Sequence, residues 1–161
     1  NPNEKWDWKS ISYNPNVDWN IIQSNPDKDW DIRFISLNPN IIEDILYKNM
    51  DKKWDWEALS WNKNITLSFV KKHMNLPWDW IGISANPNIF YQMMLETPEL
   101  PWDWEGISQN PRVNCDYINA NRKLPWNWEG ISKNPNLTLE FIMANRHLLC
   151  FTYLSQNKFN H

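Results

Sequence analysis

Apolar and polar residues recur along this chain with a period of 24 residues, which is repeated six times without a gap. Trp marks the first position of every repeat, here called position 1: Trp6, Trp30, Trp54, Trp78, Trp102 and Trp126. Position 6 is always Ile or Leu, position 7 is always Ser, and position 9 is always Asn, followed by Pro in every repeat except the one with Lys63. Such uninterrupted short repeats predict a solenoid, in which each unit packs only against its neighbours.

Each repeat carries two helix-start signatures. In a hydrophobic staple, the residue before the N-cap packs on the fourth helical residue. An N-cap at position 2, which is Asp except for Asn127, places the Trp and the position-6 Ile or Leu in this relation. A second N-cap at position 13 lies between apolar residues at positions 12 and 17. It holds Asp18, Thr66, Asn114 and Thr138, with Ile42 and Phe90 as exceptions.

The spacing also predicts how long the two helices are. Pro at position 10 disfavours helical angles at the preceding Asn, so the first helix is about six residues long. The second runs for about eight residues and often ends near a Pro at the repeat boundary. Helices this short are unstable alone and need stacked neighbours. The predicted fold class is therefore all-α, an α-solenoid of 24-residue helix-turn-helix repeats.

A leucine-rich-repeat-like solenoid is the alternative fold. Its period fits, and the Ile-Ser-x-Asn-Pro-Asn-Leu pattern resembles its characteristic turn. However, the place of one expected ladder residue is taken by Ser10, Gly82, Gly106 or Gly130.

The ends of the chain differ from the interior repeats. Residues 1–5 match the end of a unit, so we expect the chain to begin partway through a repeat. After residue 149 the pattern decays: Cys150 stands in the Trp phase, and residues 154–157 give the Ile-Ser-x-Asn pattern one residue early. We therefore expect residues 1–161 to form a single repeat domain whose units start near each position-1 Trp, closed by a degenerate C-terminal cap at 150–161.

Composition and motifs argue against several classes of function. The formal net charge is -3 with both signs scattered, so no basic stripe suggests a nucleic-acid partner, and no apolar run is long enough to span a membrane. The three His residues fall at unrelated repeat positions, and the chain has no Gly-rich phosphate loop. We expect a non-enzymatic protein without cofactor or metal, in which the position-2 Asp caps a helix and the position-7 Ser and position-9 Asn bond nearby backbone.

The string Pro-Trp-Asp-Trp-x-Gly-Ile-Ser-x-Asn-Pro-Asn resembles tandem repeats of giant, mimivirus-like DNA viruses. It stands at 77–88, at 101–111 with Arg112 in the last place, and at 125–136 with Asn127 for Asp. The closing residues 154–159 resemble the ends of those arrays. The resemblance covers the whole chain and implies a virus-encoded repeat protein, located in host cytoplasm or in the virion.

Function is expected to depend on the positions that vary while the repeat frame does not. Position 8 changes chemical type from repeat to repeat, as does position 14, and position 8 is our candidate protein-binding site: Tyr13, Leu37, Trp61, Ala85, Gln109 and Lys133. Its first half is apolar and its second half polar, which suits a contact patch for a protein partner. The first hypothesis is a scaffold that presents this surface. The alternative is a structural virion component that self-assembles or coats.

Overall fold

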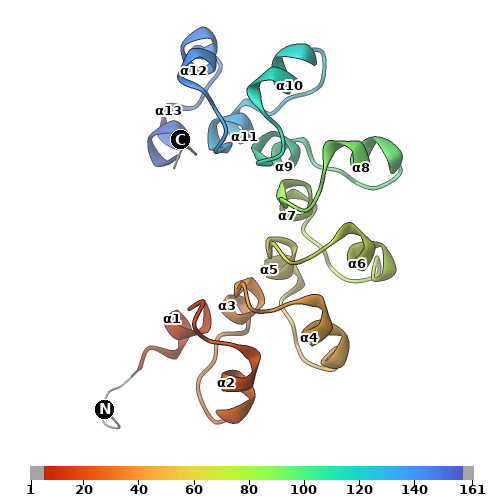
Figure 1. Ribbon diagram of the computed structural model, residues 1–161, viewed down its shortest axis with the longest axis vertical. Helices are drawn as coiled ribbons and strands as arrows, with labels where there is room; N and C mark the ends of the chain where they lie inside the picture. Colours follow the sequence, from red (N-terminus) through yellow and green to blue (C-terminus); the bar gives the residue numbers. More distant parts are fainter. Residues whose placement is uncertain (1–5, 158–161) are drawn as a thin grey trace. The chain divides into compact units, whose positions relative to one another are not determined.

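The computed structural model describes residues 6–157 and contains thirteen α-helices and no strand in that range (Figure 1). The predicted all-α repeat fold is confirmed, because every 24-residue repeat yields one pair of short helices. The leucine-rich alternative requires a strand in each repeat and is wrong for these residues. Contacts divide the chain into two compact units, residues 1–79 and 80–161, so the single repeat domain predicted over 1–161 stays a prediction.

In the first unit, the first helices of successive repeats form one row and the second helices form another (Figure 1). The first helices are α1 (Trp8–Ser12), α3 (Ile32–Leu37) and α5 (Trp56–Ser60). The second helices are α2 (Trp19–Ser24), α4 (Glu43–Lys48) and α6 (Leu67–Lys72).

The second unit repeats this arrangement. Its first helices are α7 (Trp80–Ala85), α9 (Trp104–Gln109) and α11 (Trp128–Lys133), followed in the same row by α13 (Phe151–Gln156). Its second helices are α8 (Tyr91–Glu96), α10 (Cys115–Ala120) and α12 (Leu139–Asn145).

Both predicted N-cap positions function as caps. At position 2, side-chain oxygens accept backbone N–H bonds from the first turn at Asp7, Asp31, Asp55, Asp103 and Asn127. At position 13, the same bond is made by Asp18, Thr66, Asn114 and Thr138. Ile42 and Phe90 make no side-chain cap bond, as their apolar side chains require. These caps supply acceptors for N–H groups that have no partner within the helix.

The second helices are shorter than predicted, with six or seven residues instead of about eight. All but α12 end at position 19, with position 20 as the C-cap residue, several residues before the boundary Pro. The side chain at position 20 bonds the carbonyl four residues earlier: Asn49 Nδ2 donates to Ile45 O at 2.8 Å, and Asn121 Nδ2 donates to Tyr117 O at 2.9 Å. The predicted length was wrong because a polar side chain at position 20 bonds the last turn before proline is reached, in every repeat except the one with His73.

The core is built from positions 6, 12 and 17, which are buried in nearly every repeat. Trp at position 1 follows the prediction only in part. Trp54, Trp78 and Trp126 are buried, Trp30 and Trp102 are half-buried, and Trp6 is 55% exposed. From Trp30 to Trp126, each indole N–H donates to the carbonyl five residues earlier, as in the 2.8 Å bond from Trp54 to Asn49.

Trp at position 3 connects one repeat to the next. Its ring meets the position-1 Trp of the following repeat edge to face, with centroids 5.1–5.5 Å apart, in four pairs: Trp8–Trp30, Trp56–Trp78, Trp80–Trp102 and Trp104–Trp126. Such edge-to-face pairs add roughly 0.5–1.5 kcal/mol beyond the area that they bury. The position-3 rings are half-buried, so they belong to the joint between repeats rather than to an open aromatic cage.

Ser at position 7 and Asn at position 9 also join consecutive repeats. The fully buried Ser hydroxyl accepts the position-2 N–H of the next repeat, for example Asp55 N to Ser36 Oγ at 3.2 Å. The Asn62 amide nitrogen lies 2.8, 3.1 and 3.3 Å from the Ser36, Asn38 and Ile41 carbonyl oxygens of the preceding repeat. The predicted local bonds are present as well: Ser36 Oγ donates to Ile32 O, and Asn64 N donates to Asn62 Oδ1. Both residues therefore have a second role that the sequence did not reveal.

The predicted C-terminal cap needs a correction in register. Cys150 was assigned to the Trp phase, but it is the N-cap residue of α13 and its N–H donates to Ser132 Oγ at 2.8 Å, which is the role of position 2. The buried Leu149 therefore replaces the Trp, and the preceding repeat is one residue short. Asn157 then stands at position 9 and donates to the Ser132 and Asn134 carbonyls. The part of the cap at 158–161 lies outside the described residues.

Position 5 determines how closely the first helices pack in the second unit. A Cβ on Gly106 would overlap the Ile81 carbonyl oxygen and lie 2.7 Å from Ser84 Cβ. A Cβ on Gly130 would lie 2.6 Å from the Glu105 carbonyl oxygen. Only Gly permits this approach of one helix backbone to the next.

Candidate functional site

The apolar half of the position-8 row lies in the first unit and is open to solvent. Tyr13 is 54% exposed and Trp61 is 45% exposed, while Leu37 is half-buried. Leu37 and Trp61 come from adjacent first helices, α3 and α5, and line one cavity of about 280 Å³. The structure thus brings together two residues that the sequence had placed in the candidate site.

Charged residues surround this α3–α5 cavity. Arg33 and Glu57 line it at position 4 of their repeats, and Ala58 adds to its apolar lining. The Trp61 indole N–H donates to Asp79 Oδ2 at 2.7 Å, which holds the ring in place. The site therefore combines an anchored aromatic ring and an aliphatic side chain with a charged rim, as the centres of protein-binding surfaces do.

The polar half of the row lies in the second unit, where its side chains are less exposed and Lys133 is bonded within the chain. Ala85, Gln109 and Lys133 are all half-buried. Lys133 Nζ lies 2.6 Å from Glu105 Oε1 and 4.6 Å from the centre of the Tyr153 ring. The hydrogen bond with the Glu105 carboxylate raises the pKa of Lys133 above its ordinary value. Because Lys133 is already paired and stacked, this half of the row offers less to a partner.

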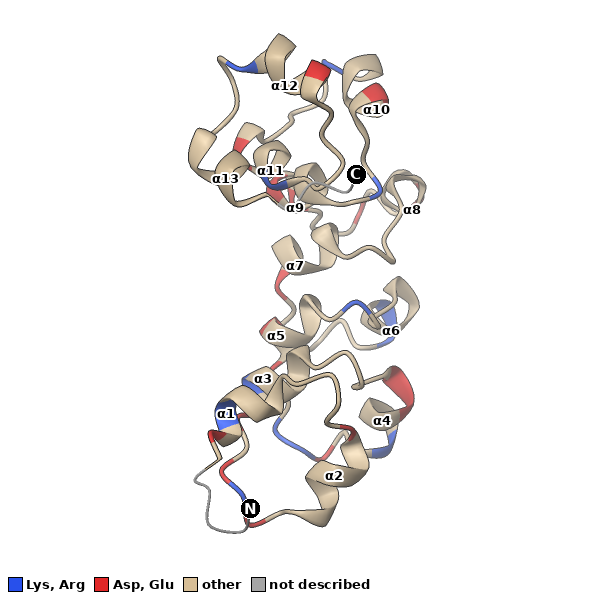
Figure 2. Ribbon diagram, turned by 60° about the vertical axis from the view of Figure 1, so that its left-hand side comes forward, with Lys and Arg blue, Asp and Glu red and all other residues tan. Residues whose placement is uncertain are grey.

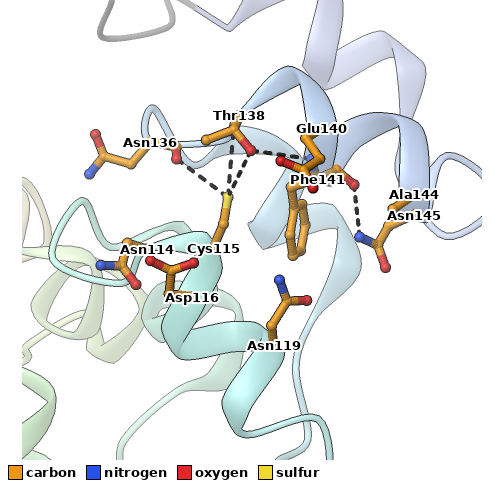
Figure 3. A pocket seen from close by; sticks show the side chains of 10 residues that line it. All are labelled: Asn114, Cys115, Asp116, Asn119, Asn136, Thr138, Glu140, Phe141, Ala144 and Asn145. Atoms are coloured by element: carbon orange, nitrogen blue, oxygen red, sulfur yellow. Dashed lines mark hydrogen bonds between the residues drawn. The ribbon is translucent and has the colours of Figure 1, made fainter.

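A second kind of cleft lies between consecutive second helices. Between α2 and α4 it has a volume of about 540 Å³ and is lined by Trp19, Asn20, Gln23 and Lys48, among others. Between α10 and α12 it has a volume of about 310 Å³, with Cys115 and Phe141 facing each other from the two helices (Figure 3). The two clefts use the same repeat positions, 13, 14, 15 and 18 of one repeat with 11, 16 and 20 of the next.

The residue at position 14 changes what this cleft contains. Cys115 contacts the next repeat through Sγ, which is 3.5 Å from Asn136 O and 3.4 Å from the Thr138 N–H that it accepts (Figure 3). In the first unit, Glu43 reaches from α4 to the next repeat and accepts bonds from Thr66 N at 2.8 Å and Thr66 Oγ1 at 2.7 Å. Tyr91 packs on Tyr117, with ring centres 4.6 Å apart, and burial raises the pKa of Tyr117.

These clefts lie outside the predicted site residues. The sequence showed that position 14 varies from Trp19 to Glu43 to Cys115, but nothing in the pattern indicated that its side chain lies between two helices. The sequence signal was the variation at position 14, together with position 11 of the following repeat, which is Asn in every repeat except the one with Arg112. Asn40 and Asn136 line the two clefts from this position.

Within residues 6–157, no three His, Cys, Asp or Glu side chains are grouped in a way that could hold a metal ion. Both cysteines are free thiols, Cys115 buried and Cys150 half-buried. No helix in the described part of the chain combines the length and apolar character that a membrane span requires. His161 lies outside the described residues.

No family model, curated protein or solved structure matches this chain. The resemblance to the repeats of giant viruses therefore remains a hypothesis, based on the motifs at 77–88, 101–111 and 125–136.

Proposed function

We propose that this chain is a non-enzymatic repeat scaffold that binds a protein partner through the α3–α5 surface, with Leu37 and Trp61 as its anchors. The observation that carries the proposal is the cavity that these two side chains share. The repeat resemblance suggests a virus-encoded protein that acts in host cytoplasm or in the virion.

The chemistry of the surface supports a protein ligand. Trp61 presents a large ring that is fixed by its bond to Asp79, so little conformational entropy is lost when a partner covers it. Arg33 and Glu57 offer opposite charges at the rim, which can orient a partner without an extended field of one sign. Frame residues such as Ser36 and Asn62 are committed to joints between repeats, which leaves the varied positions to provide specificity.

The test is a double substitution, Leu37→Asp with Trp61→Asp, made in the full chain. Truncating anchors of this kind typically costs at least 2 kcal/mol each, so affinity for a partner identified by co-purification should fall by roughly 100-fold or more. Binding is measured by titration with the purified partner, and folding is checked by thermal melting.

The matched control is Leu139→Asp with Met143→Asp, which makes the same change at two highly exposed apolar residues of α12. The control should retain the partner. Unchanged affinity of the Leu37 and Trp61 variant, in a protein that melts normally, would exclude the α3–α5 surface as the binding site.

The second candidate function is a structural component that self-assembles. It is favoured by four exposed apolar side chains that fall close together in the sequence of the second unit: Leu139, Met143, Leu148 and Phe151. For this function the Leu139 and Met143 variant is the test, and the Leu37 and Trp61 variant is the control. If light scattering shows an assembly that is lost in the Leu139 and Met143 variant but kept in the Leu37 and Trp61 variant, self-assembly is the better description.

A further inference from the structure

We infer that the cleft between α2 and α4 is a second binding site, which takes the carboxylate side chain of an acidic peptide segment. The inference does not depend on the α3–α5 surface, because the two cavities have no lining residue in common. It rests on two donors from residues that line the α2–α4 cleft and on a carboxylate that the chain itself places between the next pair of second helices.

The first donor is the indole N–H of Trp19. Its Nε1 atom is shielded from solvent and has no hydrogen-bond partner. Leaving a buried donor unpaired is unfavourable, so the group calls for an acceptor that the chain does not supply. The ring is held against Trp54, with centroids 5.2 Å apart, and it lines the cleft.

The second donor is the ammonium group of Lys48, on the α4 side of the cleft. Lys48 is exposed and forms no ion pair within residues 6–157. The ends of α4 and α6 carry both charges, and Figure 2 shows red as well as blue on α4. Glu43, Asp44 and Asp51 are outnumbered there by Lys48 and four further exposed lysines, which are Lys52, Lys53, Lys71 and Lys72. Of these, only Lys52 is paired, with Asp51 at 3.6 Å. This basic border favours a segment with several carboxylates over one with a single carboxylate.

The next pair of second helices, α4 and α6, shows how a carboxylate is held at the equivalent place. There the Glu43 carboxylate crosses to the following repeat and accepts the backbone N–H of Thr66. The equivalent N–H one repeat earlier belongs to Ile42; it has no acceptor among the described residues, but Ile42 does not line the α2–α4 cleft. The equivalent of Glu43 is Trp19, so this cleft lacks the internal carboxylate that its neighbour contains.

One acidic residue, Asp18, lines the cleft and must be considered. Its carboxylate caps α2 and accepts the Ile21 N–H at 2.9 Å, so part of its charge is offset by the helix terminus. Asn20 and Gln23 add neutral amide groups to the wall, which can bond the main chain of a bound segment. A carboxylate on a flexible side chain can reach into the cleft, whereas the phosphates of a nucleic acid lie along its backbone.

The experiment measures binding of a short fluorescein-labelled peptide rich in Glu to the full chain by fluorescence anisotropy. We expect saturable binding that weakens with added salt. Lys48→Gln should weaken it about tenfold or more, as the loss of a hydrogen bond between charged groups does. Trp19→Phe keeps the aromatic ring but removes the N–H, and should weaken binding several-fold.

Three controls make the result decisive. Lys123→Gln removes an exposed charge in the other unit and should leave binding unchanged, and the matched peptide with Gln for Glu should not bind. The Leu37 and Trp61 double variant should bind the acidic peptide normally, which separates this site from the proposed function. Thermal melting confirms that each variant is folded.

The proposal is overturned if the Glu-rich peptide does not bind, or if Lys48→Gln and Trp19→Phe both leave its affinity unchanged. It is also overturned if a labelled single-stranded RNA binds more tightly and displaces the peptide, since the basic border would then serve a nucleic acid.

Discussion

The two compact units follow one repeat frame but pack their first helices differently. In the three full repeats of the second unit, position 5 is Gly, and α9 contacts both α7 and α11 much more extensively than α3 contacts α1 or α5. In the first unit the same position holds Ser10, Phe34 and Ala58. Phe34 is 39% exposed, at a position where the second unit has no room for a Cβ.

This difference indicates that the residue at position 5 limits how closely the first helices approach one another. Where the helices are further apart, position 8 offers exposed apolar side chains, Tyr13 and Trp61. Where they are close, position 8 of one repeat reaches the preceding helix, as Lys133 reaches Glu105. The open surface in the first unit and the self-paired row in the second therefore have a common origin in packing.

The largest effect is expected when the same Trp position is changed in the two units. Trp126 is buried and donates to Asn121 O at 2.9 Å, so Trp126→Ala should lower the free energy of unfolding by about 3–5 kcal/mol. Trp6→Ala, at a largely exposed ring, should lower it by much less. Urea titration followed by circular dichroism measures both. Equal losses would mean that Trp6 belongs to the core after all.

A smaller effect tests the spacing directly. Gly106→Ala forces a Cβ against the Ile81 carbonyl and should destabilise the protein by about 1–3 kcal/mol, as overpacking does. The matched change in the first unit, Phe34→Ala, places the same residue at the same position and should cost less than about 1 kcal/mol. If Gly106→Ala proved neutral, the first helices of the second unit could separate freely and the comparison would fail.

The smallest effect concerns the ion pair in the second unit. Lys133→Met should lower stability by about 0–1 kcal/mol, because both partners are partly exposed. The pKa of Lys133 is raised in the folded state, so its contribution is complete below the ordinary value of 10.5 and is lost as pH rises through the folded value. The difference in Tm between wild type and variant should therefore shrink above that pH. Lys123→Met, at a residue without an ion pair in residues 6–157, should show no such trend.

Much of the fold could be predicted because its causes lie within one repeat. Asp55 and Thr66 are short polar residues before apolar periodic positions, and that pattern is enough to predict two caps. What could not be predicted depends on a neighbour. The bonds of Ser36 and Asn62 to adjacent repeats require the stacking distance, and the shift at Leu149 requires the bond from Cys150 to Ser132.

Of the two candidate sites, the sequence predicted one. The variation at position 8 identified Leu37 and Trp61, because position 8 changes from repeat to repeat while the frame positions stay nearly constant. The α2–α4 cleft could not be identified in this way, since Trp19 in a Trp-rich sequence is expected to be core. Only the three-dimensional structure shows that the indole N–H of Trp19 is buried without a hydrogen-bond acceptor.

The joint made by the position-9 Asn has a consequence for how such an array can change over generations. The amide nitrogens of Asn38, Asn110 and Asn134 donate only to main-chain carbonyls of the preceding repeat, and the Ser hydroxyls accept only a main-chain N–H from the next. These bonds do not depend on which side chains the neighbouring repeat carries, so they place no restriction on the order of the copies. The remaining restriction comes from the paired Trp rings and from the residue at position 5, so repeats that agree at those positions can be duplicated, deleted or shuffled without other substitutions.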